Sequence, residues 1–292
     1  MSESNPIQQL SIVSKIDVPL SRWTWLRKSL LFAELSKLAY FPDHEIVELV
    51  RSAGITECEF VERDGAQAYI LGTDDDCMVV CRGTEPHEWN DVKADANAFT
   101  VLTEVGRLHI GFNTEVDDLW PMLEQRIKEN RRPMWFAGHS LGGAMATICA
   151  GRCKLSKIPS NPEAIFTFGS PRVGNQRYIN FVKIPHYRWV NNNDVVPRVP
   201  PPWLGYRHSG QELYIDTDGN LRSIQSWVRF ADRMRGLWQA MLQGQIDYFG
   251  DHGMDRYIQA IQKAVEKDQS GELGYVLTHP LLPEVQNRTV SV

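Results

Sequence analysis

Ser140 stands out among the residues that could do chemistry, because it lies between glycines at the junction of two apolar runs. The sequence of this region, residues 135–150, is WFAGHSLGGAMATICA. The run before Ser140 is typical of a buried strand, and the small residues after it are typical of a helix. Gly-x-Ser-x-Gly between a strand and a helix is the pattern of a nucleophile elbow, a sharp turn that exposes the serine hydroxyl. A tight turn without catalytic function is the alternative.

The glycines around Ser140 fit the geometry that such an elbow needs. Side chains two residues before and two residues after the serine would collide, which explains Gly138 and Gly142. Gly143 and Ala144 allow the helix to lie close to the strand. The N-terminus of that helix directs backbone N–H groups toward negative charge that develops beside Ser140. The sequence therefore predicts a nucleophile next to a site that stabilises an anion.

A serine hydroxyl is a poor nucleophile until a base takes its proton. In this arrangement the chain order is serine, acid, histidine. The histidines after Ser140 are His186, His208, His252 and His279. His186 begins a strand-like run and His279 lies in a Pro-rich stretch, which leaves His208 and His252 as candidates. His252 lies in a Gly-flanked loop before a helical run, and loops of this kind often carry catalytic residues.

Asp194 is the strongest candidate for the acid that orients the histidine. It ends the run WVNNND after a predicted strand, and open α/β sheets place their sites at the carboxyl ends of strands. A carboxylate there can accept a hydrogen bond from the imidazole and stabilise the imidazolium. An aspartate that only caps a loop is the alternative. Asp216 and Asp218, in the stretch IDTDG, are expected to form a hairpin turn.

The elements that position these residues alternate between strands and helices. Strands, each with its following loop, are predicted at 68–71, 78–83, 134–138, 164–171 and 186–197. Helices are predicted at 22–40, 120–130, 142–155, 226–244 and 255–267. This alternation predicts an α/β fold with a central, mostly parallel sheet covered by helices on both faces. We see no repeat and no linker, so a single domain over residues 1–292 is expected.

Composition and charge limit the classes of function. The chain of 292 residues is 42% hydrophobic and 23% charged, which is typical of a globular protein. Its net charge of −5 and the lack of a basic block argue against a nucleic-acid partner. The five cysteines show no Cys-x-x-Cys spacing and are expected to be free thiols. The N-terminal residues lack the pattern of a signal peptide, which favours a cytoplasmic protein and leaves open secretion by a route that does not read the N-terminus.

Several ordered motifs resemble the class 3 lipases, the family that includes the fungal triacylglycerol lipases and their bacterial relatives. Besides the Ser140 stretch, the motifs are VVCRGT (79–84), LHIGF (108–112), TFGSPRVGN (167–175), NNNDVVPRVPP (191–201), GYRHSGQELYI (205–215) and DHGMDRYI (251–258). The resemblance implies an α/β-hydrolase-like fold and hydrolysis of acyl esters. It implies Ser140 as nucleophile, Asp194 as acid and His252 as base, and it makes His208 a structural residue.

The resemblance also implies an oxyanion hole made by two backbone N–H groups, those of Thr84 and Leu141. Asp95 is then a candidate support for the Thr84 hydroxyl. It ends Asp91-Val92-Lys93-Ala94-Asp95, which has valine where the family pattern has tryptophan. The chemistry needs neither a metal nor an organic cofactor.

Two segments are candidates for covering the acyl site. Residues 85–97 correspond to a lid, and their polar composition predicts weak activation at oil–water interfaces and a preference for more soluble esters. Residues 226–244 predict a helix with one apolar face, which is either a cap over the acyl site or an additional core helix. Trp89, Trp227 and Trp238 are the candidate lining residues. The arginines and aromatic residues of 226–244 also suit contact with a lipid surface.

We therefore expect a serine carboxylic ester hydrolase that acts on acylglycerols through an acyl-enzyme. An esterase or phospholipase acting on short-chain, aryl or phospholipid esters is the first alternative. A lipid-binding relative without catalysis is the second, and the presence of Ser140, Asp194 and His252 argues against it. The expected partners are ester or lipid molecules, with transient contact to a lipid surface and no nucleic acid. The sequence leaves the acyl chain length and the oligomeric state open.

Overall fold

The computed structural model describes residues 11–83, 99–192, 194–222 and 252–270. Within these residues, the main sheet has eight strands in the order β1-β2-β3-β6-β7-β9-β11-β12. The inner strands from β3 to β11 run parallel, and the flanking strands are antiparallel. The strands are β1 (Glu57–Arg63), β2 (Ala66–Gly72), β3 (Cys77–Cys81), β6 (Met134–His139), β7 (Pro162–Phe168), β9 (His186–Asn191), β11 (Gln211–Ile215) and β12 (Leu221–Arg222).

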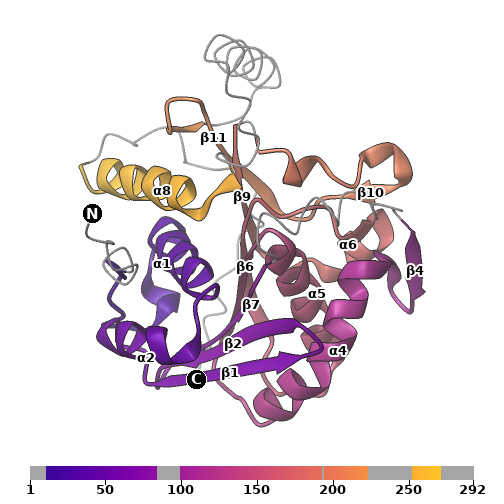
Figure 1. The fold of residues 1–292 in the computed structure, drawn as a ribbon, viewed down its shortest axis with the longest axis horizontal. Coiled ribbons are helices and arrows are strands. Elements are labelled where there is room, and N and C mark those ends of the chain that lie inside the picture. Colours follow the sequence, from indigo (N-terminus) through magenta and orange to yellow (C-terminus); the bar gives the residue numbers. More distant parts are fainter. Residues whose placement is uncertain (1–10, 84–98, 193, 223–251, 271–292) are drawn as a thin grey trace, which may run out of the picture.

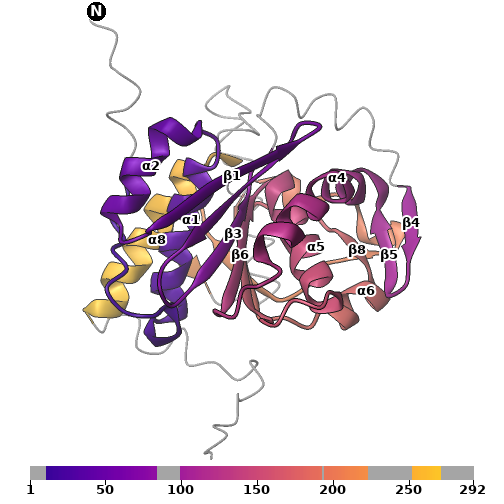
Figure 2. The ribbon, with the colours of Figure 1, turned by 90° about the horizontal axis from the view of Figure 1, so that it is seen from below.

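Helices cover both faces of this sheet (Figures 1 and 2). On one face lie α1 (Trp25–Leu38), α2 (Asp43–Ser52) and α8 (Met254–Gln269); on the other lie α4 (Ile110–Ile127), α5 (Leu141–Leu155) and α6 (Gln176–Val182). The predicted α/β fold with a mostly parallel, doubly covered sheet is therefore confirmed.

The two faces of the sheet bury separate cores, because successive side chains of a strand point to opposite sides. Val80, Ala137 and Phe166 pack in the core under α1 and α8. Their strand neighbours Val79 and Phe136 pack in the core under α4 and α5. Strands buried on both faces explain the continuous apolar runs in the sequence.

A second, smaller sheet lies beside α4 and α6 (Figure 2). Its strand order is β10-β8-β5-β4 in the described residues. These strands are β4 (Thr100–Thr103), β5 (Gly106–His109), β8 (Gly174–Asn175) and β10 (Tyr206–Arg207). The short 3₁₀ turns Leu20–Arg22, Val196–Arg198 and Pro202–Leu204 complete the described elements.

One helix begins well before the position that its sequence pattern predicts. The pattern predicts a helix over 120–130, whereas α4 extends over Ile110–Ile127 and contains Pro121. A proline is typical of a helix start, and inside a helix it removes one backbone hydrogen bond. The buried stripe that begins with Phe112 and Val116 holds α4 against the sheet in spite of this loss.

The cysteines are all free, as expected. Burial raises the pKa of the Cys77 thiol to about 11 and that of Cys153 to about 12, so both stay protonated at neutral pH. None of the helices in the described ranges combines the length and the hydropathy that a membrane span needs.

Candidate active site

Ser140 occupies the turn between β6 and α5, with backbone angles φ 58° and ψ −129°. A positive φ is unfavourable for a residue with a side chain and persists only where the surroundings enforce it. Here the Ser140 N–H donates to the carbonyl of Phe168 at 2.9 Å, and the side chain is fully buried. The strand, sharp turn and helix that the sequence predicts are confirmed.

Gly138 and Gly142 are required by close backbone approaches on the two sides of the turn. A Cβ atom on Gly138 would overlap with the backbone carbonyl group of Gly142. A Cβ atom on Gly142 would overlap with the carbonyl oxygen of Cys81, at the end of β3. The elbow therefore packs against itself and against the neighbouring strand, and only glycine fits at either position.

The helix that follows Ser140 directs its N-terminus at the serine. Leu141 is the first residue of α5, and the N–H of Gly143 donates to the Ser140 carbonyl at 3.0 Å. The first N–H groups of a helix have no acceptor within the helix, and the helix dipole favours negative charge at this end. The Leu141 N–H is therefore placed where it can stabilise an oxyanion formed beside Ser140.

His252 and Asp194 form a buried hydrogen-bonded pair. His252 Nδ1 lies 2.8 Å from Asp194 Oδ2, and the two side chains are 3% and 0% exposed. An ionised carboxylate only accepts hydrogen bonds, so Nδ1 carries the proton and Nε2 is the basic nitrogen of the neutral ring. Asp194 Oδ1 also accepts from the Val196 N–H at 2.9 Å. Of the two histidines that spacing alone left open, His252 is the one paired with Asp194.

A tyrosine of α8 adds a further contact that sequence reasoning missed. The Tyr257 hydroxyl donates to Asp194 Oδ2 at 2.6 Å and accepts from the Asn191 N–H at 3.1 Å. The segment 252–270 thus brings both His252 and Tyr257 to the carboxylate. The only sequence signal was the proximity of Tyr257 to His252, which does not by itself indicate a role.

Gly169, the residue after β7, lies directly against the His252–Asp194 pair. Its φ is +60°, and an added Cβ would lie 2.6 Å from Asp194 Oδ2 and 2.8 Å from His252 Cε1. The preceding residue, Phe168, accepts from the Ser140 N–H. Residues 168 and 169 therefore connect the serine to the His–Asp pair, which places all three side chains at one end of the parallel strands.

Replacement of Gly169 by alanine is expected to lower kcat by about 10²-fold, because a displacement of about 1 Å in a catalytic group has effects of this size. The new methyl group must push apart the Asp194 carboxylate and the His252 ring. Gly219→Ala is the matched control, since Gly219 has a similar φ of +70° but nothing within 4 Å of an added Cβ. It should lose only the stability that a positive φ costs an alanine, and it should keep its kcat in ester hydrolysis. Equal kcat losses in the two variants would contradict this explanation.

Two further histidines after Ser140, His208 and His186, make structural hydrogen bonds. His208 Nε2 lies 2.7 Å from the Pro197 carbonyl oxygen, and burial lowers the pKa of His208 well below its usual value. His186 contacts the hydroxyls of Thr167 and Ser209 at 2.8 and 2.7 Å, and burial lowers its pKa to about 3. Both rings are therefore neutral and held away from Asp194.

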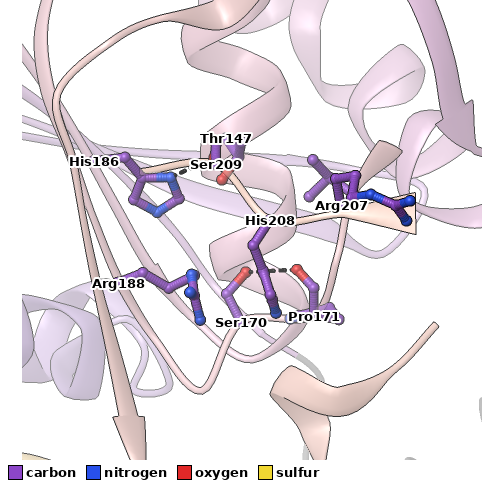
Figure 3. A pocket seen from close by; sticks show the side chains of 9 residues that line it. Thr147, Ser170, Pro171, His186, Arg188, Arg207, His208 and Ser209 are labelled. Carbon is purple, nitrogen blue, oxygen red and sulfur yellow. Dashed lines mark hydrogen bonds between the residues drawn. The ribbon is translucent and has the colours of Figure 1, made fainter. Parts of the chain in front are cut away.

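These two histidines line a small cavity on the α5 side of the sheet (Figure 3). Arg188 and Ser170 also line it, and Arg188 pairs with Glu212 at 2.9 Å. The cavity contains neither Ser140 nor Asp194, so it lies apart from the His–Asp pair. In the described ranges, the His, Cys, Asp and Glu side chains form no group of three or more that could hold a metal ion.

The remaining candidates lie outside the described residues. These are Thr84, Trp89 and Asp95 with the lid segment 85–97, and Trp227 and Trp238 with the helix predicted at 226–244.

Gly83, the residue just before Thr84, is within the described ranges and lies against the elbow. A Cβ on Gly83 would lie 2.6 Å from the His139 carbonyl oxygen and 3.3 Å from Ser140 Cβ.

The turn residues Asp216 and Asp218 behave as predicted, because Asp216 Oδ1 accepts from the Asp218 N–H at 3.0 Å in the β11–β12 hairpin.

Comparison with known proteins gives consistent matches to one family. Residues 78–203 match the family model of lipase (class 3). A secreted mono- and diacylglycerol lipase of Fusarium solani is 44% identical over 82 residues, which cover 27% of this chain and 24% of that protein. Toxin TseL of Vibrio cholerae is 26% identical over 201 residues, or 54% of this chain and 31% of the toxin. The first curated relatives are thus matched over only about a quarter of their length.

A solved structure of a triacylglycerol lipase, in which a serine protease triad forms the catalytic centre, superposes with a TM-score of 0.54. It is 25% identical and covers 66% of this chain and 82% of that one.

The fold and the elbow define an α/β-hydrolase-type protein. Residues 78–203, which make up less than half of the chain, match the class 3 lipase family, so over this region the chain is similar to the class 3 lipases. The resemblance expected from the motifs is therefore confirmed. The Fusarium solani relative is named a secreted lipase, and the cytoplasmic location of this chain stays a prediction.

Proposed function

We propose that this protein hydrolyses carboxylic esters of acylglycerols by a serine acyl-enzyme mechanism. The observation that carries the proposal is the strained elbow at Ser140, held by Phe168 and Gly169 beside the buried His252–Asp194 pair. Strain and burial of this kind are costly for stability and are typical of active sites. A turn that served only the fold would need neither a buried serine hydroxyl nor a buried His–Asp pair next to it.

In the proposed reaction, Ser140 Oγ attacks the ester carbonyl while His252 Nε2 takes the hydroxyl proton. Asp194 stabilises the imidazolium that results. The Leu141 N–H, together with Thr84 as the second donor, stabilises the oxyanion. The protonated His252 then gives its proton to the leaving alcohol, and an acyl-enzyme is left on Ser140.

Deacylation reverses these roles. Water attacks the acyl-enzyme while His252 takes its proton; His252 then returns this proton to Ser140 Oγ as the fatty acid leaves, which restores the free enzyme. Ser140 Oγ has no hydrogen-bond partner among the described residues. In catalytic sites the hydrogen bond between nucleophile and base often tightens only when substrate is bound.

The choice of acylglycerols rests on the relatives, which are named mono- and diacylglycerol and triacylglycerol lipases. A second candidate, an esterase for short and soluble esters, is favoured by the polar composition of the proposed lid at 85–97. The apolar face predicted for the proposed cap at 226–244 favours long acyl chains, with Trp227 and Trp238 as lining residues. These two segments therefore make opposite predictions about chain length.

Hydrolysis of p-nitrophenyl esters from acetate to palmitate, alongside emulsified triolein and phosphatidylcholine vesicles, separates the candidates. We expect activity on the long esters and on triolein. Activity confined to acetate and butyrate would replace the lipase assignment by the esterase one. Preferential release of fatty acid from phosphatidylcholine would indicate a phospholipase. A folded protein without activity on any of these esters would contradict the proposed function.

A further inference from the structure

We propose that His139 is a positioning residue for catalysis, which holds the backbone of His252 in place, and that Tyr40 fixes the tautomer in which His139 does so. This inference rests on the proposed function, because it assigns His139 and Tyr40 to the same reaction. His139 occupies the variable position of the Gly-x-Ser-x-Gly elbow, where the turn itself makes no demand for histidine.

The contact between the two histidines runs from a side chain to a backbone group. His139 Nε2 lies 2.7 Å from the His252 carbonyl oxygen, and both residues are buried. A carbonyl oxygen can only accept, so His139 Nε2 carries a proton and donates it. The two rings also pack together with their centroids 4.4 Å apart. His139 thus fixes the main chain of His252, while Asp194 fixes the rotation of its ring.

Tyr40 determines which nitrogen of His139 carries the proton. Its hydroxyl lies 2.8 Å from His139 Nδ1. With the proton of the neutral ring on Nε2, Nδ1 is an acceptor and the Tyr40 hydroxyl is the donor. Without that donor, the proton can move to Nδ1, and Nε2 would then present a lone pair to the His252 carbonyl oxygen. The pair Tyr40 and His139 therefore works as one directed chain of hydrogen bonds.

His139 is suited to this task because it stays uncharged during the reaction. Burial, and the charge of His252 beside it, lower the pKa of His139 well below its usual value. When His252 becomes an imidazolium, a second positive charge on the adjacent ring would oppose proton transfer from Ser140. A neutral His139 keeps its hydrogen bond without that repulsion.

The chain of contacts also explains how distant segments set the geometry of the base. Tyr40 follows α1, His139 ends β6, and His252 lies just before α8. A Cβ on Gly83 would overlap with the Tyr40 hydroxyl, so the segment after β3 packs directly against this contact. Two sets of contacts therefore position the base, His252: the packing of α1 against α8, and the hydrogen bonds from Tyr40 to His139 and from His139 to His252.

Kinetics of three variants, His139→Leu, His139→Gln and Tyr40→Phe, test the inference on p-nitrophenyl butyrate. His139→Leu removes the donor, and we expect kcat to fall by about 10²-fold while KM stays within about twofold. Glutamine can place an amide N–H near the position of Nε2, so His139→Gln should recover about tenfold of this loss. Tyr40→Phe should lower kcat by about tenfold, because His139 keeps the wrong tautomer for part of the time.

His186→Gln is the matched control, since His186 is buried with both nitrogens hydrogen-bonded but lies apart from the His–Asp pair. It should reduce thermal stability and leave kcat unchanged. Wild-type kcat in folded His139→Leu would overturn the inference. So would equal losses of kcat in His139→Leu and His139→Gln, or losses that simply follow the unfolded fraction.

A spectroscopic measurement makes the test independent of turnover. The Nδ1 proton shared by His252 and Asp194 should give a far-downfield proton NMR signal, identified by its loss in Asp194→Ala. We expect this signal to shift and broaden in His139→Leu and to be unchanged in His186→Gln. An unchanged signal in His139→Leu would overturn the positioning role. A wild-type protein that shows the signal but hydrolyses no ester would contradict the proposed function and leave the His139 contact testable.

Discussion

Replacing Ser140 by alanine is expected to lower kcat for ester hydrolysis by about 10⁶-fold, the loss seen when the nucleophile of a serine hydrolase is removed. Without Oγ no acyl-enzyme can form, and the residual rate comes from polarisation of the ester at the oxyanion site. KM should change little, because the alanine removes only the attacking atom. Turnover of p-nitrophenyl butyrate, measured against the uncatalysed rate, checks this result.

The same variant should be slightly more stable than the wild type. Ser140 Oγ is buried without a hydrogen-bond partner in the described part of the chain, and an unsatisfied buried polar group costs about 1–3 kcal/mol. Alanine removes this cost and keeps the backbone strain of the elbow. Ser29→Ala is the control, since the Ser29 hydroxyl is buried and donates to the Trp25 carbonyl at 2.9 Å. It should keep full activity and lose stability. More than about a hundredth of wild-type kcat in Ser140→Ala would rule out Ser140 as the nucleophile.

Replacing Asp194 by asparagine is expected to lower kcat by about 10⁴-fold, as in other serine triads. The Asp194 carboxylate receives three donors: the Nδ1 of His252, the hydroxyl of Tyr257 and the N–H of Val196. An amide has one acceptor oxygen, so at least one donor must face the NH₂ group. If this donor is His252, its proton moves to Nε2, and the ring can no longer take the proton of Ser140.

The free energy of unfolding of the Asp194→Asn variant should also be lower than that of the wild type by about 1–3 kcal/mol, because one buried donor is left unpaired. Asp216→Asn is the matched control. Asp216 is also buried and accepts the backbone N–H groups of Asp218 and Asn220 at 3.0 and 2.8 Å. Urea unfolding should show a similar loss of stability in the control, and p-nitrophenyl butyrate assays should show unchanged kcat. A loss of activity in both variants to the same extent would mean that general destabilisation, not the acid role, explains Asp194.

Local features of the site were predictable because their physical demands fall within a few residues of the chain. The elbow needs glycine on both sides of Ser140. A Cβ on Gly138 or on Gly142 would overlap with nearby backbone atoms. Asp194 follows the carboxyl end of β9, where the alternation of strands and helices predicts a site. These inferences depend on periodicity and turn geometry, which a single sequence displays.

The contacts that the sequence did not reveal join segments far apart in the chain. Tyr257 reaches Asp194 across 63 positions, and Tyr40 reaches His139 across 99. Gly169 resembles any turn glycine until the fold brings His252 against it. Spacing alone likewise left His208 and His252 open; the resemblance favoured His252, and the hydrogen bond of His252 to Asp194 is the tertiary contact that separates the two. Nothing in the spacing of these residues indicates that they meet.

The small second sheet escaped prediction for a different reason. β8 and β10 have two residues each, which is too short for an alternating pattern to appear. The start of α4 was missed for two reasons. Pro121 is typical of a first helical turn, and the apolar stripe that extends the helix back to Ile110 is interrupted by polar positions, which hides its helical period.

The central claim is that Ser140 is a nucleophile activated by His252 and Asp194, and titration with a fluorophosphonate tests it most directly. The reagent reacts rapidly only with an activated serine, and peptide mass spectrometry locates the phosphonyl group. We predict rapid labelling of about one site per chain, located on Ser140 and slowed strongly in Asp194→Asn. Slow labelling spread over several serines, or rapid labelling that Asp194→Asn leaves unchanged, would contradict the claim.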